Sequence, residues 1–234
     1  NVFEKVANGS KELLLVTGYS GIGKSSLVKE VHKPIAKQRG IFLEGKFDQY
    51  KKDIPYSALL QAFNLLIVQI LQQSDEQLNN WKNKIQNALT INGQVIIDIL
   101  PELERIIGKQ ENINVLNPEE NQNRLYYTLR QFVGVFASKE HPLVIFLDDL
   151  QWSDLATLSF VEDIMKSSQV DYLLIIGAYR NNEVGDSHAL NITLADISKA
   201  RAIHRFLLNK LDEKTTNQFV SDTLSNNVEE TGRI

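Results

Sequence analysis

Residues 13–26 read LLLVTGYSGIGKSS, an apolar run that leads directly into a glycine-rich loop. The run Leu13–Thr17 is typical of a buried strand, and from Leu27 onward apolar side chains recur with helical spacing. Between them, the residues from Gly18 to Ser25 satisfy the pattern G-x-x-x-x-G-K-[ST] in full. A strand, this loop and a helix in that order predict a phosphate-binding loop.

Each residue type in this loop has a chemical reason. Glycines let the backbone wrap closely around phosphates with its N–H groups pointing inward, and the helix that follows adds the positive end of its dipole. Lys24 would supply a point charge to the β and γ phosphates, and the Ser25 hydroxyl would bind Mg²⁺. A glycine-rich surface turn with a solvated lysine is the alternative interpretation. The residues expected to bind the nucleotide are Ser20, Gly21, Ile22, Gly23, Lys24, Ser25 and Ser26.

A pair of acids follows a second apolar run, Leu143–Leu147. A carboxylate at the carboxyl end of a buried parallel strand can hold Mg²⁺ beside the phosphates, usually through water. We therefore expect Asp148 to bind the metal together with Ser25, and Asp149 to orient and polarise the attacking water. Taken alone, two acids after a strand are equally compatible with an ordinary acidic turn.

A cation follows a third strand. The run Tyr172–Tyr179 is apolar without alternation, as expected of a strand that is buried on both faces. Arg180 leaves the carboxyl end of this strand, the edge at which α/β sheets bind ligands. We expect Arg180 to contact the γ-phosphate, and a solvated arginine in a loop is the alternative.

The rest of the chain is expected to alternate helices and strands, so the fold class is α/β. Pro34 is expected to kink or end the helix after the loop. We expect an ATPase core at residues 1–211, with a helical insertion at about 55–139, and the start of a helical lid at 212–234. Other expected strands are Ile41–Phe47 and Ile203–Leu208, and other expected helices are Ser57–Leu71, Trp81–Leu89, Val95–Ile107, Glu119–Ser138, Leu190–Lys199 and one from a Ser153 cap to Lys166.

The composition narrows the function. The chain has 234 residues, 43% of them hydrophobic, a formal net charge of −4 and no cysteine. These values exclude a disulfide scaffold, a zinc ribbon and a thiol nucleophile, and they give no reason to expect a nucleic-acid site. No apolar window is long enough to predict a membrane span. Because the chain begins at Asn1 and its one methionine is Met165, we expect a piece of a longer protein or a processed product.

The three motifs together resemble the signal-transduction ATPases with numerous domains (STAND), which are related to the AAA+ proteins. The resemblance rests on Gly18–Ser26, Leu147–Asp154 and Gly177–Arg180, and it covers about residues 1–225. The segment Gly45–Tyr50 is similar to the ATPase region of large bacterial proteins that join a serine/threonine kinase, this ATPase and a sensor histidine kinase. The ATPase of MalT-like transcription regulators is similar but more distant.

This resemblance implies the three-layer αβα fold of P-loop NTPases, with a parallel sheet of order 5-1-4-3-2. It makes Arg180 the sensor of the γ-phosphate. The second acid is commonly Glu in AAA+ enzymes, so Asp149, whose side chain is shorter, implies slow turnover. Family members continue into a lid with a Gly-x-Pro turn and a winged helix, and no Gly-x-Pro follows Asp212 here. We therefore expect weak nucleotide binding and hydrolysis by this chain.

The expected function is a regulatory ATPase module that binds Mg²⁺ and ATP or ADP and slowly hydrolyses ATP. The resemblance implies a nucleotide switch in the bacterial cytoplasm, with kinase, sensor or winged-helix modules of the same chain as partners and nucleotide-dependent self-assembly. A P-loop phosphotransferase acting on a small acceptor and a nucleotide-binding scaffold without turnover remain alternatives. No guanine-reading N-K-x-D motif is present, which favours ATP. Trp81 and the pair Tyr126-Tyr127 either form an interface or pack on the sheet.

Overall fold

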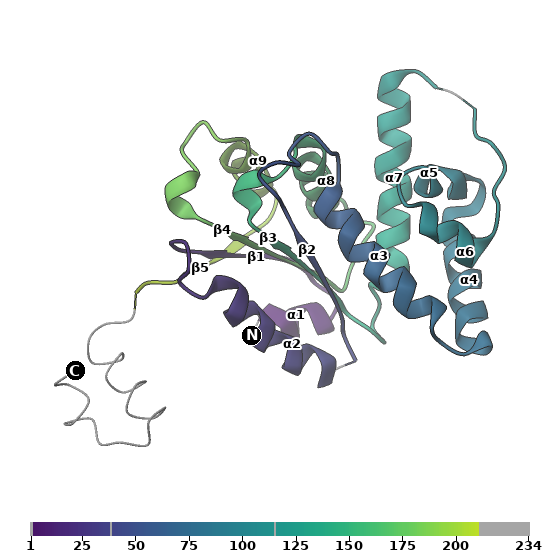
Figure 1. Cartoon of the computed structure of the whole chain (residues 1–234), viewed down its shortest axis with the longest axis horizontal. Coiled ribbons are helices and arrows are strands. Elements are labelled where there is room, and N and C mark those ends of the chain that lie inside the picture. The colour runs from purple at the N-terminus through teal and green to yellow at the C-terminus, as the bar shows by residue number, and fades with distance from the viewer. Residues whose placement is uncertain (1, 38, 115, 211–234) are drawn as a thin grey trace.

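A parallel sheet of five strands forms the centre of the molecule (Figure 1). The computed structural model describes residues 2–37, 39–114 and 116–210. The strands are β1 (Lys11–Thr17), β2 (Ile41–Lys46), β3 (Leu143–Asp148), β4 (Leu173–Tyr179) and β5 (Ile203–Leu207). Their spatial order is β2-β3-β4-β1-β5, and every neighbouring pair is parallel. This confirms the α/β class and the expected strand order.

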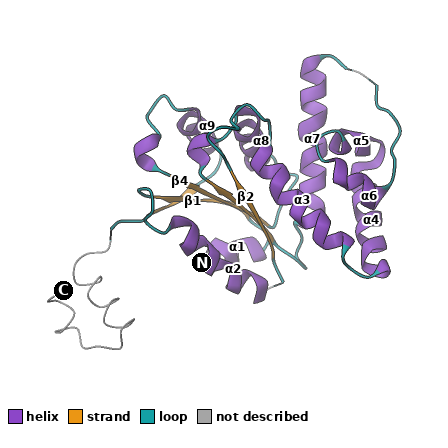
Figure 2. Cartoon of the chain, viewed as in Figure 1, coloured by secondary structure: helices purple, strands orange, loops and turns teal. Residues whose placement is uncertain are grey.

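Helices cover both faces of the sheet, which gives three layers (Figures 1 and 2). Helices α1 and α2 lie on one face, and α3, α8 and α9 lie on the other. Helices α4 to α7 pack beyond α3, at the β2 edge of the sheet. The helices are α1 (Val2–Ala7), α2 (Lys24–Lys37), α3 (Ser57–Leu71), α4 (Asp75–Leu89), α5 (Gly93–Ile97), α6 (Glu104–Ile107), α7 (Pro118–Phe136), α8 (Leu155–Lys166) and α9 (Ala189–Ser198), with 3₁₀ turns η1 (Thr90–Asn92), η2 (Pro101–Leu103), η3 (Leu150–Trp152) and η4 (Asn181–Glu183).

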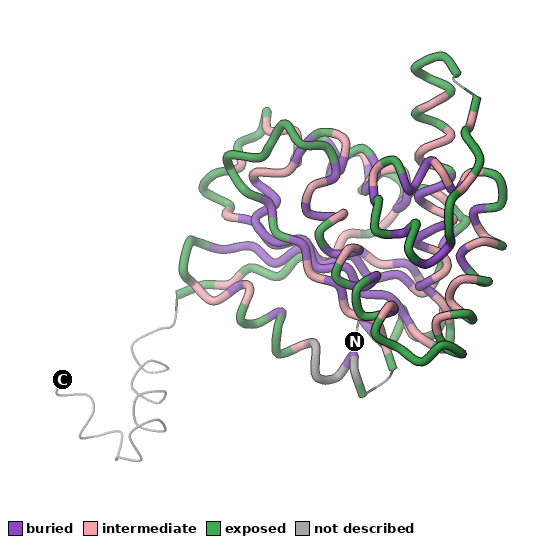
Figure 3. Tube along the Cα trace, turned by 45° about the vertical axis from the view of Figure 1, so that its right-hand side comes forward, coloured by how far each residue is buried: buried purple, intermediate pink, exposed green. Residues whose placement is uncertain are grey.

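The sheet separates two apolar cores. Every residue of β3 and β4 is buried, and Figure 3 shows the buried strands running through the middle of the molecule. Successive residues of a strand point to opposite faces. Val144 and Phe146 therefore join the core under α1 and α2, whereas Ile145 and Leu147 join the core under α3 and α8. Burial on both faces explains why these strands read as continuous apolar runs.

The helical insertion packs largely on itself and on the core. The ring centroids of Phe63 on α3 and Phe136 on α7 are 6.0 Å apart, and Trp81 on α4 lies 5.3 Å from Phe136. Tyr126 packs against an aromatic ring of α8, at 6.1 Å. Internal packing thus accounts for Trp81 and Tyr126, whereas Tyr127 is 45% exposed. An interface at Trp81 or Tyr126 is therefore not needed to explain these side chains.

Helix α2 corrects one half of the expectation that Pro34 kinks or ends it. Pro34 does not end this helix, which continues to Lys37. A proline in a helix removes one backbone hydrogen bond, and the loss is tolerated where tertiary packing holds the next turn. Here Ile35 is 0% exposed and belongs to the core between α2 and the sheet. Burial of the residue after the proline therefore outweighs the broken bond.

Helix α8 corrects a second sequence expectation, which concerns the residue that caps its start. The expected cap, Ser153, instead donates a hydrogen bond from Oγ to the Leu150 carbonyl, at 2.7 Å. The 3₁₀ turn η3 displaces the start of the helix by one residue, and Asp154 caps it by accepting from the N–H of Thr157, at 2.7 Å. Both Ser and Asp are good caps, so composition alone does not distinguish them.

Two smaller differences concern short helices. The expected helix Val95–Ile107 is divided into α5, η2 and α6, because the chain turns before Pro101. A further short helix, α1, lies before β1, where no helix was predicted from the sequence. Its buried residues are Phe3 and Val6, so a contact with the sheet stabilises a helix too short to form alone. The expected lid at 212–234 lies outside the described residues.

Candidate functional site

The glycine-rich loop joins β1 to α2 at the carboxyl edge of the sheet. Gly21 and Gly23 have φ values of 73° and 96°, a region that residues with a side chain rarely adopt. A Cβ atom built on either glycine would meet no heavy atom within 4 Å. Positive φ at both glycines, with open space beside them, is compatible with the backbone of a phosphate cradle.

Lys24 begins α2 and is 7% exposed. Its Nζ donates to the carbonyl oxygens of Gly18, at 2.9 Å, and Tyr19, at 2.8 Å. Burial lowers the pKa of Lys24, and the nearby charge of Arg180 lowers this pKa further. A lysine ammonium has three N–H donors. Two of them hold Lys24 against the loop, which leaves one donor for a phosphate oxygen.

Ser25 and Asp148 meet although they are 123 residues apart in the sequence. Ser25 Oγ donates to Asp148 Oδ2 over 2.7 Å, which joins the start of α2 to the end of β3. Hydroxyl and carboxylate oxygens are ligands that Mg²⁺ accepts, and phosphates and water usually complete its shell. In the described part of the chain, no group of three or more His, Cys, Asp or Glu residues is arranged to hold a metal. Ser25 and Asp148 together supply oxygen atoms of the kinds that a magnesium ion takes.

Asp149 follows Asp148 at a sharp turn. Its φ and ψ are 57° and 45°, the left-handed region that Asp tolerates better than most residues, and the residue is 6% exposed. Its N–H donates to Asp148 Oδ1 at 3.0 Å. Asp149 Oδ1 accepts from Gln151 Nε2 at 2.9 Å, and Oδ2 lies 3.2 Å from Lys46 Nζ. The turn thus places a second carboxylate beside the first and fixes its orientation.

Arg180 lies just past the end of β4, and its side chain has several partners. Its Nη1 pairs with Glu183 Oε1 at 2.7 Å, and its Nε lies 3.7 Å from Asp149 Oδ1. The guanidinium also stacks over the ring of Trp152, with Cζ 4.9 Å from the ring centroid. Arg180 is therefore held at the acid pair by neighbouring groups rather than extended into solvent.

Lys46 reaches the same acids from β2. Its Nζ is 3.2 Å from Asp149 Oδ2 and 3.8 Å from Asp148 Oδ2. The hydrogen bond with Asp149 raises the pKa of Lys46. In the register of the sheet, Lys46 is the partner of Asp148 on the adjacent strand. No role was predicted for this lysine from the sequence.

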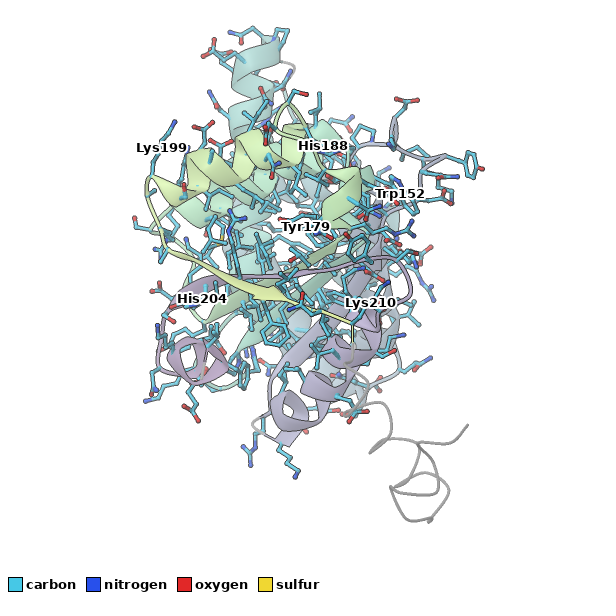
Figure 4. The ribbon with its side chains drawn as sticks, turned by 90° about the vertical axis from the view of Figure 1, so that its left-hand side faces the viewer. Trp152, Tyr179, His188, Lys199, His204 and Lys210 are labelled. Atoms are coloured by element: carbon cyan, nitrogen blue, oxygen red, sulfur yellow. The ribbon has the colours of Figure 1, made fainter. Side chains whose placement is uncertain are left out.

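Gln151 connects the acid pair to β4 and α9. Its Oε1 accepts from the N–H of Arg180 at 3.2 Å, and its carbonyl lies 3.1 Å from His188 Nε2. His188 Nδ1 accepts from the N–H of Leu190 at 3.1 Å, so the ring proton is on Nε2 and donates to Gln151. Figure 4 shows His188 and Trp152 near the end of β4 at Tyr179. The side-chain amide and the backbone carbonyl of Gln151 together therefore connect the acid turn, the end of β4 and the start of α9.

The AAA ATPase domain family matches residues 1–176, a range that includes the loop and both acids. The chain belongs to this family. Hybrid signal transduction histidine kinase G of Dictyostelium discoideum is 36% identical over 165 residues, which are 70% of this chain and 5% of the relative. Histidine protein kinase 1 of Candida albicans is 28% identical over 182 residues, which are 70% of this chain and 7% of the relative. The chain thus spans a small part of each relative's length.

One solved structure, VirB4 of Thermoanaerobacter pseudethanolicus, aligns with 93% of this chain and 82% of its own, at 11% identity and a TM-score of 0.31. Within the described residues of this AAA ATPase domain, no helix is both long and apolar enough to cross a membrane.

A cleft opens beside the acid pair of the AAA ATPase domain. Its volume is about 490 Å³, and it lies between the end of β2, the start of α3 and η3. The residues that line it are Lys46, Phe47, Asp48, Lys51, Ser57, Gln61 and Trp152. The cleft shares Lys46 and Trp152 with the surroundings of Asp149 and Arg180, so it adjoins the partners of the acid pair, whereas Asp148 and Asp149 themselves are buried.

The structure therefore brings Ser25, Asp148, Asp149 and Arg180 to one edge, next to Lys24 and the loop. Lys46 and Gln151 were missed as site residues. Lys46 could have been predicted, because the expected strand order makes strands 2 and 3 neighbours. The carboxyl end of strand 2, which carries Lys46, then lies beside the acids that follow strand 3. Gln151 lies within the segment Leu147–Asp154 that carries the resemblance, but no role was assigned to it, since a glutamine after an acidic turn is ordinarily exposed.

Proposed function

We propose that the chain is a regulatory ATPase module that binds Mg²⁺ and ATP within a larger signalling protein. The observation that carries the proposal is the 2.7 Å hydrogen bond from Ser25 Oγ to Asp148 Oδ2. It joins a complete phosphate-loop motif to a carboxylate at the end of a buried strand, which is the arrangement that a magnesium–nucleotide complex requires. The membership in the AAA ATPase domain family supports the same reaction class.

The proposed binding residues are the loop segment 20–26, which surrounds the phosphates with backbone N–H groups. Lys24 gives its remaining N–H donor to a phosphate oxygen. Ser25 and Asp148 hold the magnesium ion, which when bound neutralises part of the phosphate charge. Ser25 and Asp148 are already in contact, so these two side chains need little rearrangement when the ion binds.

Asp149 is proposed to orient the attacking water and to accept its proton. Gln151 and Lys46 fix the Asp149 carboxylate, so its reach is set by its own short side chain. A water must therefore come close to the turn after β3, and slow hydrolysis follows from this restriction. Arg180 is proposed as the γ-phosphate sensor, because its Nε is 3.7 Å from Asp149 Oδ1 and its side chain lies beside Glu183 and Trp152 at the same edge.

The regulatory part of the proposal comes from the resemblance and the relatives. The histidine kinases of Dictyostelium discoideum and Candida albicans contain a segment similar to this chain, which supports a signalling role. We propose a STAND-type nucleotide switch that acts on kinase, sensor or winged-helix modules of the same protein and self-assembles with ATP. The boundaries 1–211 and 212–234, and a bacterial source, remain predictions, since these relatives are eukaryotic.

A titration of the chain with a fluorescent ATP analogue and Mg²⁺ tests the proposal. Lys24→Ala should abolish binding, because it removes the charge inside the loop. Lys139→Ala is the matched control, since Lys139 is exposed and precedes β3, at the opposite edge of the sheet. Asp149→Ala should keep affinity within about threefold and stop phosphate release in a single turnover. Absence of nucleotide binding by the wild-type chain would contradict the proposal, and binding without any release would favour the scaffold alternative.

A further inference from the structure

Lys46 is the cation that contacts both acids of the proposed site. Its Nζ is 3.2 Å from Asp149 Oδ2 and 3.8 Å from Asp148 Oδ2. Arg180 reaches Asp149 alone, at 3.7 Å. Among the ion pairs of the described residues, Asp148 has Lys46 as its cationic partner. Lys46 on β2 therefore shares the charge compensation of the acid pair with Arg180 and with the nearby charge of Lys24, and it is the exposed member of this set.

The backbone that carries Lys46 is held in place. The N–H of Lys46 donates to Gln61 Oε1 on α3 at 3.2 Å, and the N–H of Phe47 donates to the Asp148 carbonyl at 3.1 Å. A Cβ on Gly45 would lie 2.0 Å from the carbonyl oxygen of Ala58, so α3 packs directly on the strand. The Cα of Lys46 is thus fixed between β3 and α3, and motion is left to its side chain.

The side chain of Lys46 is free to leave the acids. It is 59% exposed, whereas the side chains of Asp148 and Asp149 are 5% and 9% exposed. The adjoining cleft of about 490 Å³ gives the ammonium room, and Asp48 and Gln61 line this cleft with polar groups. A long flexible side chain on a rigid strand end can therefore occupy either the acid pair or the cleft.

The ammonium and a metal ion would compete for one oxygen. Asp148 Oδ2 already accepts from Ser25 Oγ at 2.7 Å, and Lys46 Nζ approaches the same oxygen. A divalent ion between Ser25 and Asp148 would stand within a few ångströms of this ammonium, and like charges repel strongly in a partly buried site. Without another source of negative charge, the ion has to displace Lys46 from both acids.

We propose that Lys46 is a tethered counter-ion that excludes free divalent metal from Asp148 and Asp149 and yields the site to metal that arrives with a nucleotide. The nucleotide phosphates bring several negative charges, which offset the repulsion that the metal alone would face. Lys46 then turns from Asp148 toward the cleft. This inference rests on the proposed magnesium–nucleotide site and adds a residue that makes metal binding conditional on nucleotide.

Manganese binding followed by electron paramagnetic resonance tests the role of Lys46, since free and bound Mn²⁺ give different signals. Without nucleotide, Lys46→Met should bind Mn²⁺ about tenfold more tightly than the wild-type chain. Lys46→Arg should behave as wild type because it keeps the charge. Lys51→Met, which removes an equal charge from the same cleft, is the matched control and should also behave as wild type. Adding Asp148→Asn to Lys46→Met should abolish the gained affinity.

Nucleotide supplies the second arm of the experiment. With saturating ATP, the Mn²⁺ affinities of wild type and Lys46→Met should converge to within about threefold, because the phosphates now provide the charge. Equal Mn²⁺ affinities without nucleotide, or a tenfold gap that persists with ATP, would overturn the role of Lys46. A wild-type chain that binds no ATP would instead overturn the proposed function. Thermal melting of each variant verifies that it is folded, and Lys46→Gln replaces Lys46→Met if the latter does not fold.

Discussion

The side-chain amide of Gln151 donates a hydrogen bond to Oδ1 of Asp149 over 2.9 Å. The same side chain accepts from the N–H of Arg180 at 3.2 Å, and Gln151 is 3% exposed. One buried amide therefore fixes the orientation of the Asp149 carboxylate, which is proposed to orient water. It also fixes the backbone of Arg180, the proposed sensor, at the end of β4. We regard Gln151 as a positioning residue for both.

Replacing Gln151 by Met should separate hydrolysis from binding. The variant keeps the length of the side chain and loses both hydrogen bonds, so the Asp149 carboxylate loses one of the groups that fix its orientation and keeps Lys46. We expect phosphate release in a single turnover to slow about tenfold, while the affinity for Mg²⁺ and ATP changes less than about threefold. Gln73→Met, at an exposed position, is the control. Equal losses of rate and affinity would indicate that Gln151 supports the fold of the whole site rather than one carboxylate.

The features predicted from sequence are those with local signals. The helix expected at Ser57–Leu71 has the same bounds in the structure, because its apolar spacing and the polar residues around it act within a few turns. The loop motif likewise identifies Lys24 and Ser25 without knowledge of distant contacts. The strand order has no local signal, because it depends on pairing between segments that are remote in the sequence. It was predicted from the family resemblance instead.

The features that were missed depend on such remote contacts. Lys46 lies in a segment that the sequence analysis singled out, yet its charge acquires a role only when β2 pairs with β3 and places it opposite Asp148. Gln151 becomes a buried connector only because β4 ends beside it. The cap of α8 shows the same limitation, since Asp154 also accepts from the N–H of Tyr56 at 3.2 Å, a contact 98 residues distant in sequence.

Gly45 should be far less replaceable than another glycine with room around it. A Cβ at Gly45 would lie 2.0 Å from a backbone oxygen of Ala58, and backbone cannot move aside as a flexible side chain can. We expect Gly45→Ala to lower the free energy of unfolding by about 1–3 kcal/mol or more. Gly134→Ala in α7, where a Cβ meets nothing within 4 Å, should instead stabilise the chain by about 0.5–1 kcal/mol. Urea unfolding measures both, and similar effects of the two substitutions would contradict the clash.

Asp154 should contribute more than an ordinary helix cap. It accepts from the N–H groups of Thr157, at 2.7 Å, and Tyr56, at 3.2 Å, so it joins the starts of α8 and α3. Asp154→Ala should cost about 2–4 kcal/mol, the sum of a lost cap and a buried N–H left unpaired. Asn117→Ala, at the exposed capping box of α7, should cost about 1 kcal/mol. Unfolding free energies that are equal for the two variants would show that the Tyr56 contact contributes nothing.

Lys11 is a buried charge at the opposite edge of the sheet. It is 2% exposed, and its Nζ donates to the carbonyl oxygens of Ile164 and Ser167 at the end of α8. Burial lowers the pKa of Lys11 from 10.5 to about 8, and the charge of Arg201 acts in the same direction. A neutral amine still has two N–H donors, so both hydrogen bonds survive deprotonation.

The stability of the chain should therefore rise with pH in a defined window. Between pH 8 and 10.5 the unfolded chain keeps a proton on Lys11 that the folded chain has released, so folding is favoured as the pH increases. Across this window, the unfolding free energy of the wild-type chain should rise relative to that of Lys11→Met by up to about 3 kcal/mol. Urea unfolding at about pH 7.5 and about pH 10 measures this shift. If the wild-type chain gains no stability over Lys11→Met as the pH rises, the prediction is wrong. The carbonyl oxygens at the end of α8 would then stabilise the charged form of Lys11 enough to cancel the effect of burial on its pKa.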